Sequence, residues 1–348
     1  MYSRFFKKIL FHLDPEISHR IALQGLQFAY QSGLTRFYSQ PAEANSCRVM
    51  GIDFPNRVGL AAGMDKNGDY IAALSSLGFG FIEIGTVTLK PQPGNATPRL
   101  FRLSEQEAII NRMGFNNKGC DYVEKKLQQT KFSGILGINI GKNVNTPLSA
   151  ANNDYVELFR RLAPYASYIT LNISSPNTSE LRDLQHGDLL VSLLKTMKSE
   201  QGKLARYVPL VIKIAPDLTD EQLSMIAGIV LEQGIDGVIA TNTTLSRSGV
   251  ENSEFANEAG GLSGKPLLIP ANDILQKLHG LLQGKIPIIA SGGVMSGADA
   301  KAKLEAGASL VQVYSGLVYR GPGLVAEATL FTSPLVGEVD AKRRMRGL

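Results

Sequence analysis

Eight short apolar segments recur along the sequence, and their regular spacing restricts the chain to very few folds. They cover residues 58–63, 81–87, 135–141, 168–174, 210–216, 237–243, 286–293 and 310–316, and longer stretches with a helical pattern separate them. Their apolarity is continuous rather than alternating, which is typical of strands buried on both faces of a parallel sheet. Eight strand–helix units predict an α/β fold of the (β/α)8 TIM-barrel type, with a doubly wound open sheet as the alternative.

Two polar segments interrupt this spacing. Residues 91–115 lengthen the connection after the second predicted strand, and residues 99–103 and 108–112 have the pattern of a small hairpin. Residues 177–187 form a polar loop after the fourth predicted strand. Both segments follow the carboxyl end of a strand, where barrel enzymes build their active sites. We therefore expect a hairpin insertion at the barrel mouth, and both segments are either lids or simple surface loops.

The first 40 residues precede the barrel and predict two helices. Asp14 and Pro15 are a typical helix start, and Gly33 is a typical helix end. Both helices carry an apolar face, so they either pack on the barrel or form a module for a membrane surface or a lipophilic substrate. We divide the chain into this helical module (1–40), the barrel (41–332) and a basic tail (333–348).

The bulk composition excludes several classes of protein. The net charge of +5 is too diffuse to predict a nucleic-acid partner, and two cysteines are too few for a disulfide scaffold. No apolar run reaches the roughly 18 residues of a transmembrane helix. The N-terminus lacks the pattern of a signal peptide. We expect a globular protein of a reducing compartment, with no metal site.

Polar side chains end most of the predicted strands, and Lys213 is the most informative of them. It lies inside an apolar strand with isoleucine on both sides. Lysine is rarely buried without a partner, because removing its charge from water is costly. Lys213 therefore forms either a structural salt bridge or a contact with a cofactor or substrate. The carboxyl ends of barrel strands meet at one rim, so further polar residues are expected beside it, among them Lys66, Thr86, Asn139, Asn172, Thr241 and Asn242.

Glycine-rich turns follow the last two predicted strands. Ser291-Gly292-Gly293 and Tyr314-Ser315-Gly316 can bring backbone N–H groups close to an anion, and residues 260–264 (GGLSG) can contribute from the preceding connection. Together with a helix N-terminus, such turns form the usual phosphate site of these barrels. Their joint placement indicates a phosphorylated cofactor such as FMN.

Taken together, the motifs resemble those of the dihydroorotate dehydrogenase family, specifically of its quinone-dependent, membrane-associated class (class 2). They run in order over about residues 1–330, from GLAAGMDKNG (59–68) through INRMGFNN (110–117) and NISSPNT (172–178) to LVQVYSG (310–316). LDPEISHR (13–20) resembles the N-terminal extension of the quinone class. Serine at position 175, where the soluble class has cysteine, points to the same class.

The resemblance implies two sets of binding residues. For FMN the set is Ala62, Gly63, Lys66, Thr86, Asn139, Asn172, Lys213, Thr241, Gly264, Gly293, Tyr314 and Ser315. For dihydroorotate the set is Lys66, Asn111, Arg112, Met113, Gly114, Phe115, Asn172, Asn177, Asn242 and Thr243. The chemistry of the substrate agrees with this set, since a lysine pairs with its carboxylate and asparagines both donate to and accept from its amide-like ring edges.

The resemblance also implies the reaction, which is oxidation of (S)-dihydroorotate to orotate in pyrimidine biosynthesis. Ser175 would remove the C5 proton while the C6 hydride passes to FMN, with Thr178 in a proton relay and Phe115 as apolar cover. Serine is a weak base, so the site must be dry. His19 and Arg102 would lie near the path of the final acceptor, ubiquinone or menaquinone; a surface or packed histidine is the alternative for His19.

The family further implies a monomer in peripheral contact with lipid on the cytoplasmic face of the inner membrane. Two other interpretations stay open. The first is a soluble dehydrogenase that uses fumarate or NAD, and the N-terminal extension argues against it. The second is a flavin-binding barrel without turnover, acting as a membrane-docked partner protein, and the presence of Lys66, Asn111, Ser175 and Asn177 argues against it.

Overall fold

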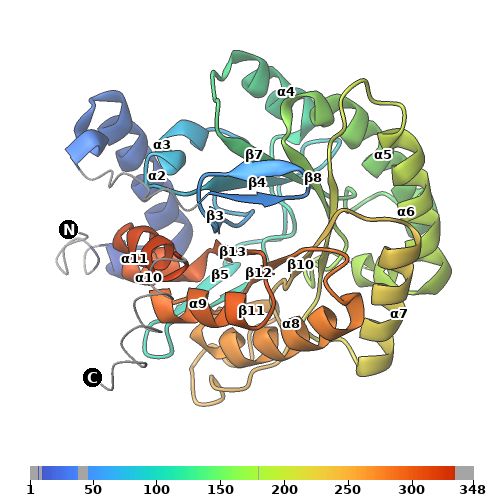
Figure 1. Ribbon diagram of the computed structural model, residues 1–348. Helices are drawn as coiled ribbons and strands as arrows, with labels where there is room; N and C mark the ends of the chain where they lie inside the picture. Colours follow the sequence, from blue (N-terminus) through green and yellow to red (C-terminus); the bar gives the residue numbers. More distant parts are fainter. Residues whose placement is uncertain (1–6, 8–9, 38–45, 179, 334–348) are drawn as a thin grey trace, which may run out of the picture.

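The computed structural model describes residues 7, 10–37, 46–178 and 180–333. At its centre eight parallel strands close into a barrel in the order β3-β4-β7-β8-β9-β10-β12-β13 (Figure 1). Each strand falls within one of the apolar segments, so the predicted (β/α)8 barrel is confirmed and the open sheet is excluded. The strands are β3 Val58–Leu60, β4 Phe81–Val87, β7 Ile135–Ile140, β8 Tyr168–Asn172, β9 Leu210–Ile214, β10 Gly237–Ala240, β12 Ile288–Ser291 and β13 Leu310–Val313.

Helices surround the barrel, and local sequence signals mark their ends. In α7 (Asp220–Glu232) the Thr219 side chain accepts from the N–H of Gln222, whose side chain accepts from the N–H of Thr219. This capping box marks the start of the helix, and Gly234, which has positive φ, follows its end. The other helices of the barrel are α3 Ile71–Ser75, α4 Gly119–Gln129, α5 Ala151–Leu162, α6 Gly187–Gln201, α8 Leu268–Leu282, α9 Gly297–Glu305, α10 Ser315–Arg320 and α11 Gly323–Phe331.

A short hairpin that the apolar spacing does not predict packs against the amino end of the barrel. Its strands are β1 Cys47–Val49 and β2 Ile52–Phe54, joined by two residues that both have positive φ. Turns of this kind match the right-handed twist of hairpins. The hairpin places Phe54 under the strands, with its ring 5.3 Å from the ring of Phe81, edge to face.

Large and small side chains fit together inside the barrel near its amino end. Phe81 and Tyr168 are buried there, with their rings 6.4 Å apart. Gly59 lies against the first ring and Gly137 against the second, and a Cβ on either glycine would lie 2.2 Å from its ring. The barrel is therefore a packed core at this level, as such barrels usually are.

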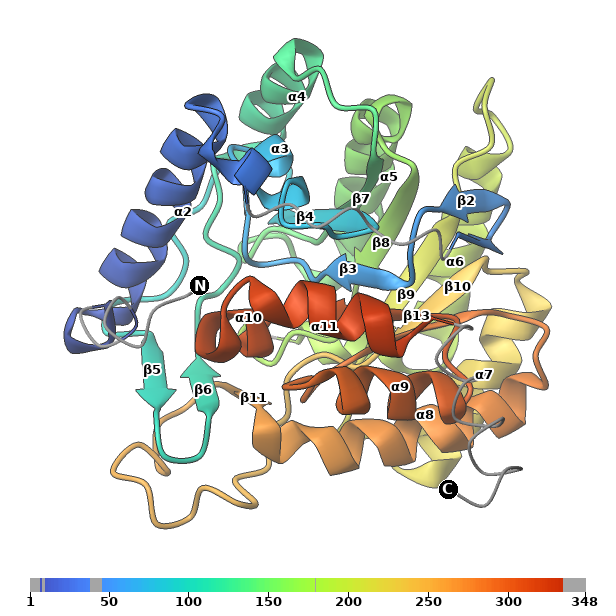
Figure 2. The same cartoon turned by 60° about the vertical axis from the view of Figure 1, so that its left-hand side comes forward.

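A second small sheet lies at the carboxyl ends of the strands, where the hairpin was expected. β5 Leu100–Leu103 pairs antiparallel with β6 Ala108–Asn111, which confirms the hairpin. β11 Gly261–Gly264 adds to β6 as a third strand, so the GGLSG segment is a strand as well as a glycine-rich connection. Figure 2 shows this sheet beside the N-terminal helix α2 (Pro15–Gln31).

Helix α2 is the second of the two predicted N-terminal helices. Asp14 Oδ1 accepts from the N–H groups of Glu16 and Ile17 at 2.9 and 3.1 Å, and Gly33 follows the helix with positive φ, as predicted. The helix packs beside α3 and β5. Much of the first predicted helix and almost all of the tail lie outside the described residues, so the division of the chain into three parts stays a prediction.

The contact between Gly137 and Tyr168 predicts a difference between two glycine-to-alanine variants. Gly137→Ala should destabilise the protein by about 1–3 kcal/mol, because the new methyl group must displace a buried ring. Gly228→Ala, in α7, should be neutral or stabilise by up to about 1 kcal/mol, since no atom lies within 4 Å of the added Cβ. Thermal unfolding measures both, and equal melting temperatures would contradict the packing described.

Candidate active site

A cavity of about 440 Å³ opens at the carboxyl ends of the barrel strands. Lys213 of β9 contributes to it from the barrel, Asn111 and Phe115 from the hairpin sheet and the segment after it, and His19 from α2. Ser175, which follows β8, lines it as well. The barrel, the insertion and the N-terminal helix therefore build one site.

Most of the site residues named from the sequence line this cavity. Asn139, Arg112, Thr178 and Arg102 are not among the residues that line it. Those that do are His19, Ala62, Gly63, Lys66, Thr86, Asn111, Met113, Gly114, Phe115, Asn172, Ser175, Asn177, Lys213, Thr241, Asn242, Thr243, Gly264, Gly293, Tyr314 and Ser315.

Amide and hydroxyl side chains form a continuous hydrogen-bonded chain across the barrel side of the cavity. Thr86 Oγ1 donates to Asn139 Oδ1 at 2.6 Å, and Asn172 Nδ2 donates to both residues at 3.0 and 3.1 Å. Asn242 Nδ2 in turn donates to Asn172 Oδ1 at 3.3 Å. In each amide the nitrogen donates and the oxygen accepts, so these hydrogen bonds fix the orientation of the amide group.

This series of hydrogen bonds ends on Glu83, a fully buried side chain inside the barrel that was not predicted as a site residue. Asn139 Nδ2 donates to Glu83 Oε1 at 2.9 Å, while Tyr168 OH and Gln312 Nε2 donate to Oε2 at 2.9 and 2.8 Å. Neutral donors thus surround both oxygens, as a buried carboxylate requires. A signal was present in the sequence, because Glu83 has isoleucine on both sides, as Lys213 does.

Lys213 is 6 % exposed, and its ammonium has no hydrogen-bond or ion-pair partner within the described part of the chain. Burial lowers the pKa of Lys213, and Glu83 acts in the opposite direction. The lack of a salt bridge favours the second of its two predicted roles, contact with a ligand. Gln312 lines the same cavity, and its buried Oε1 also lacks a partner among the described groups. A bound molecule with both acceptor and donor atoms would satisfy the two side chains.

Unpaired backbone N–H groups lie on the side of the cavity that the last two strands form. Gly292 and Gly293 have positive φ, and their N–H groups donate to no other described group. A Cβ on Gly293 would lie 2.3 Å from the Leu268 backbone, so glycine is required in this turn. Successive free N–H groups of this kind make an anion site, as the glycine pattern predicts.

Lys66 and His19 meet where the barrel faces α2. The Lys66 ammonium donates to the Gly63 carbonyl at 2.9 Å. Burial lowers the pKa of Lys66 to about 8, and Glu16 and Asp65 act in the opposite direction. Burial also lowers the pKa of His19 to about 3, with Lys66 adding to the effect. At neutral pH the lysine is therefore mostly charged, and the half-buried imidazole is neutral.

Ser175 lies in the segment after β8 and is 6 % exposed. Its Oγ accepts the N–H of Asn177 at 3.3 Å, and Asn177 Nδ2 donates to Asn111 Oδ1 at 3.2 Å, which joins this segment to the hairpin. Thr178 lies outside the cavity wall, and its buried Oγ1 has no partner among the described residues. Phe115 has positive φ and lines the cavity.

Two of the arginines named from the sequence hold the hairpin instead of lining the cavity. Arg112 forms an ion pair with Glu258, and its guanidinium lies 4.7 Å from the centre of the Phe101 ring. Arg102 donates to the carbonyls of Leu10 and Phe11 at 3.0 and 3.2 Å, so it connects the hairpin to the N-terminal segment.

An ion pair between Arg99 and Glu16, which no sequence motif indicated, also lies at this site. Arg99 Nε lies 2.7 Å from Glu16 Oε1, and the side chains are 12 % and 29 % exposed. The pair joins the hairpin to α2 at the edge of the cavity, which Glu16 lines. No local pattern signals a pair between residues so far apart in the sequence.

Comparisons with known proteins show what the chain as a whole is similar to. The family model for dihydroorotate dehydrogenase matches residues 45–329. The dihydroorotate dehydrogenase (quinone) of Methylococcus capsulatus is 53 % identical over 331 residues, which is 94 % of this chain and 97 % of the relative. That of Idiomarina loihiensis is 55 % identical over 323 residues, 92 % of this chain and 96 % of the relative. A crystal structure of DHODH from Eimeria tenella in complex with ferulenol has a TM-score of 0.84 and 36 % identity, and covers 94 % of this chain and 93 % of that one.

The environment of His19 predicts that its imidazole does not titrate between about pH 5 and pH 8, the range in which an ordinary histidine takes up its proton. The unfolded chain does bind that proton near pH 6.5, so His19 should lower the stability of the fold as the pH falls below this value. Histidine NMR spectra of the protein and of His19→Gln identify the signal. A midpoint near 6.5 would contradict the burial described.

Proposed function

The chain belongs to the dihydroorotate dehydrogenase family, and we propose that FMN bound in its barrel accepts a hydride from dihydroorotate. The family model covers most of the chain, and the relatives named above as quinone enzymes match it over nearly their whole length. The reaction is the oxidation of (S)-dihydroorotate to orotate in pyrimidine biosynthesis, with a quinone as the final electron acceptor.

One observation carries the proposal for the site: Ser175, in the segment after β8, and the unpaired Lys213 of the neighbouring strand β9 line one cavity. The oxidation removes a proton and a hydride from adjacent carbons of the substrate. It therefore needs a proton acceptor and a hydride acceptor in the same cavity. Ser175 is our candidate for the first, and the groups around Lys213 mark where the second binds.

The barrel side of the cavity fits FMN. When bound, FMN supplies the hydride-accepting ring that no amino-acid side chain can provide. Lys213 and Gln312 would donate to and accept from a ring edge, and the N–H groups of Gly292 and Gly293 would hold the phosphate. The other residues assigned to FMN are Ala62, Gly63, Lys66, Thr86, Asn172, Thr241, Gly264, Tyr314 and Ser315. Asn139, also assigned to FMN, would act indirectly, because its oxygen accepts hydrogen bonds from Thr86 and Asn172.

Dihydroorotate would bind between this site and the hairpin. Lys66 carries the charge that the substrate carboxylate needs, and the amides of Asn111, Asn177 and Asn242 offer donors and acceptors to the ring. Thr243, Asn172, Met113, Gly114 and Phe115 complete the wall. We assign Arg112 the task of holding the hairpin, since its guanidinium pairs with Glu258.

Ser175 would take the C5 proton even though a hydroxyl is a weak base. Its low exposure limits contact with bulk water, which favours proton transfer inside the site. The buried hydroxyl of Thr178 has free hydrogen-bonding capacity and is the candidate for passing the proton on. Phe115 would cover the site with an apolar ring.

The quinone would approach along α2. This helix exposes Ile17, Ile21 and Phe28, the last to 69 %, and Ile17 and His19 also line the cavity. An apolar face that continues into the cavity suits a lipophilic acceptor and contact with lipid. Arg102 would hold the N-terminal segment over this path. Within the described ranges no helix is long and apolar enough to cross a membrane.

The apolar face of α2 supports peripheral contact with the membrane surface. We place the protein on the cytoplasmic face of the inner membrane, as a monomer that uses ubiquinone or menaquinone. The basis for these assignments is the apolar face of α2 together with the named quinone relatives.

The role of Ser175 predicts the behaviour of Ser175→Ala. This variant should bind FMN and orotate as the wild type does, but reduction of its flavin by dihydroorotate should slow by about 10²–10⁴-fold, the usual contribution of a general base. Stopped-flow absorbance of the flavin measures the rate. The control is Ser224→Ala, at an exposed serine of α7, which should keep the wild-type rate. A wild-type rate in Ser175→Ala would falsify the assignment of the base.

A further inference from the structure

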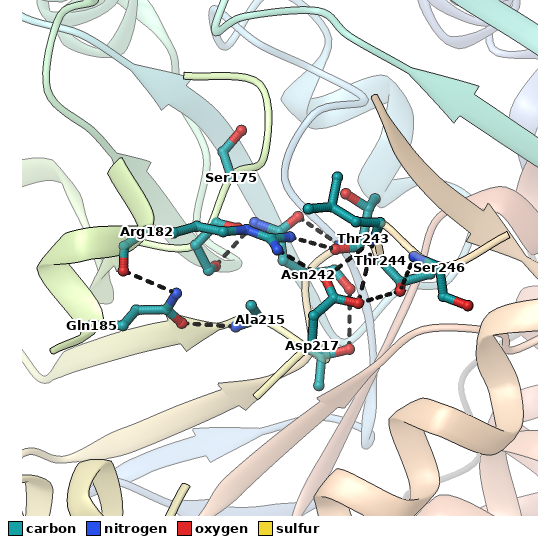
Figure 3. A network of polar contacts seen from close by, with 12 residues as sticks. Ser175, Arg182, Gln185, Ala215, Asp217, Asn242, Thr243, Thr244 and Ser246 are labelled. Carbon is teal, nitrogen blue, oxygen red and sulfur yellow. Dashed lines mark hydrogen bonds and ion pairs between the residues drawn. The ribbon is translucent and has the colours of Figure 1, made fainter. Parts of the chain in front are cut away.

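The guanidinium of Arg182 joins three loops at the barrel mouth, and the function proposed above gives it no role. Arg182 lies in a short 3-10 helix, Leu181–Gln185, that follows β8. Its Nε donates to Ser174 O and its Nη2 to Thr243 O, both at 3.2 Å. Its Nη1 pairs with Asp217 Oδ2 at 2.8 Å. Figure 3 shows Arg182 between these groups, close to Ser175.

Asp217, which follows β9, extends the connection to the loop after β10. Its Oδ1 accepts from the hydroxyl of Thr244, and its carboxylate also accepts from the N–H of Leu245 at 3.1 Å. The side chains of Arg182 and Asp217 are only 20 % and 24 % exposed, so solvent screens this ion pair less than one on the open surface. Nearby, Gln185 Oε1 accepts the N–H of Ala215 at 2.9 Å and fixes the end of the 3-10 helix.

The loop that carries Ser175 belongs to this network. Ser175 Oγ contacts the N–H of Asn177 inside its own loop, and no described side chain from another loop hydrogen-bonds to it. The hydroxyl is therefore placed by the backbone that carries it, and Arg182 holds the carbonyl just before it. Across the site, Asn242 Nδ2 donates to the Ser174 hydroxyl at 3.0 Å.

We propose that Arg182, oriented by Asp217, is a positioning residue that fixes the distance between Ser175 and the substrate-binding pair Asn242 and Thr243. The inference rests on the proposed role of Ser175 as the base. A guanidinium suits the task because its donors point in fixed directions within one plane, so it holds two carbonyls and a carboxylate at once. A lysine keeps the charge but cannot reproduce that fork.

Arg182→Lys tests the proposal. The limiting rate of flavin reduction by dihydroorotate should fall by about 10- to 100-fold, since a displacement of about 1 Å can cost a factor of that size. FMN content should be unchanged, and orotate affinity, measured by the change in the flavin spectrum, should change by less than about 3-fold. Asp217→Asn should lower the rate in the same direction, and it tests the pair independently if Arg182→Lys proves unstable.

The matched control is Arg206→Lys, because Arg206 also donates to two carbonyls, but those of Ala163 and Ala166 precede β8, at the other end of that strand from Ser175. It should reduce at the wild-type rate. In a Ser175→Ala background, Arg182→Lys should cause little further loss, because it acts through Ser175.

Two results would overturn the inference alone: a wild-type rate in both Arg182→Lys and Asp217→Asn, or a loss in Arg182→Lys that adds fully to that of Ser175→Ala. A wild-type flavin that dihydroorotate does not reduce would instead overturn the proposed function, and the inference with it.

Discussion

Closure of the eight strands into a barrel buries the carboxylate of Glu83 where water cannot hydrogen-bond to it. The polar side chains of the site are arranged around this need for protein donors. Side chains from three other strands donate hydrogen bonds to this carboxylate: Asn139 of β7, Tyr168 and Thr170 of β8, and Gln312 of β13. Because the amide nitrogen of Asn139 donates to Glu83, its oxygen faces Thr86 and Asn172 and accepts a hydrogen bond from each of them. The order of the cavity wall thus begins with one buried carboxylate in the barrel interior.

The charges that face the cavity are arranged around that interior. Lys213 has Glu83 as the acidic group that supports its charge, and it keeps its donors free for a ligand. Lys66 is supported from the other side by Glu16 and Asp65. The two ammonium groups come from different parts of the chain, and we propose that Lys213 serves the cofactor and Lys66 the anionic substrate.

The barrel was predictable from the sequence, since strands buried on both faces leave continuous apolar runs. The hairpin β1–β2 and strand β11 were not, because three or four residues with little alternation carry no clear period. The resemblance named most of the residues around the cavity but not their supports. Glu83, Arg182 and the Arg99–Glu16 pair act through partners distant in sequence, and only the folded chain brings these together. The roles of the site residues stay predictions.

The most direct test of the account is an assay of the purified full-length protein with dihydroorotate and one electron acceptor at a time. Ubiquinone or menaquinone should support orotate formation, whereas fumarate and NAD should not, because the apolar face of α2 leads into the cavity and suits a lipophilic acceptor. Orotate formation with fumarate or NAD but not with a quinone would contradict the account, as would its absence with every acceptor.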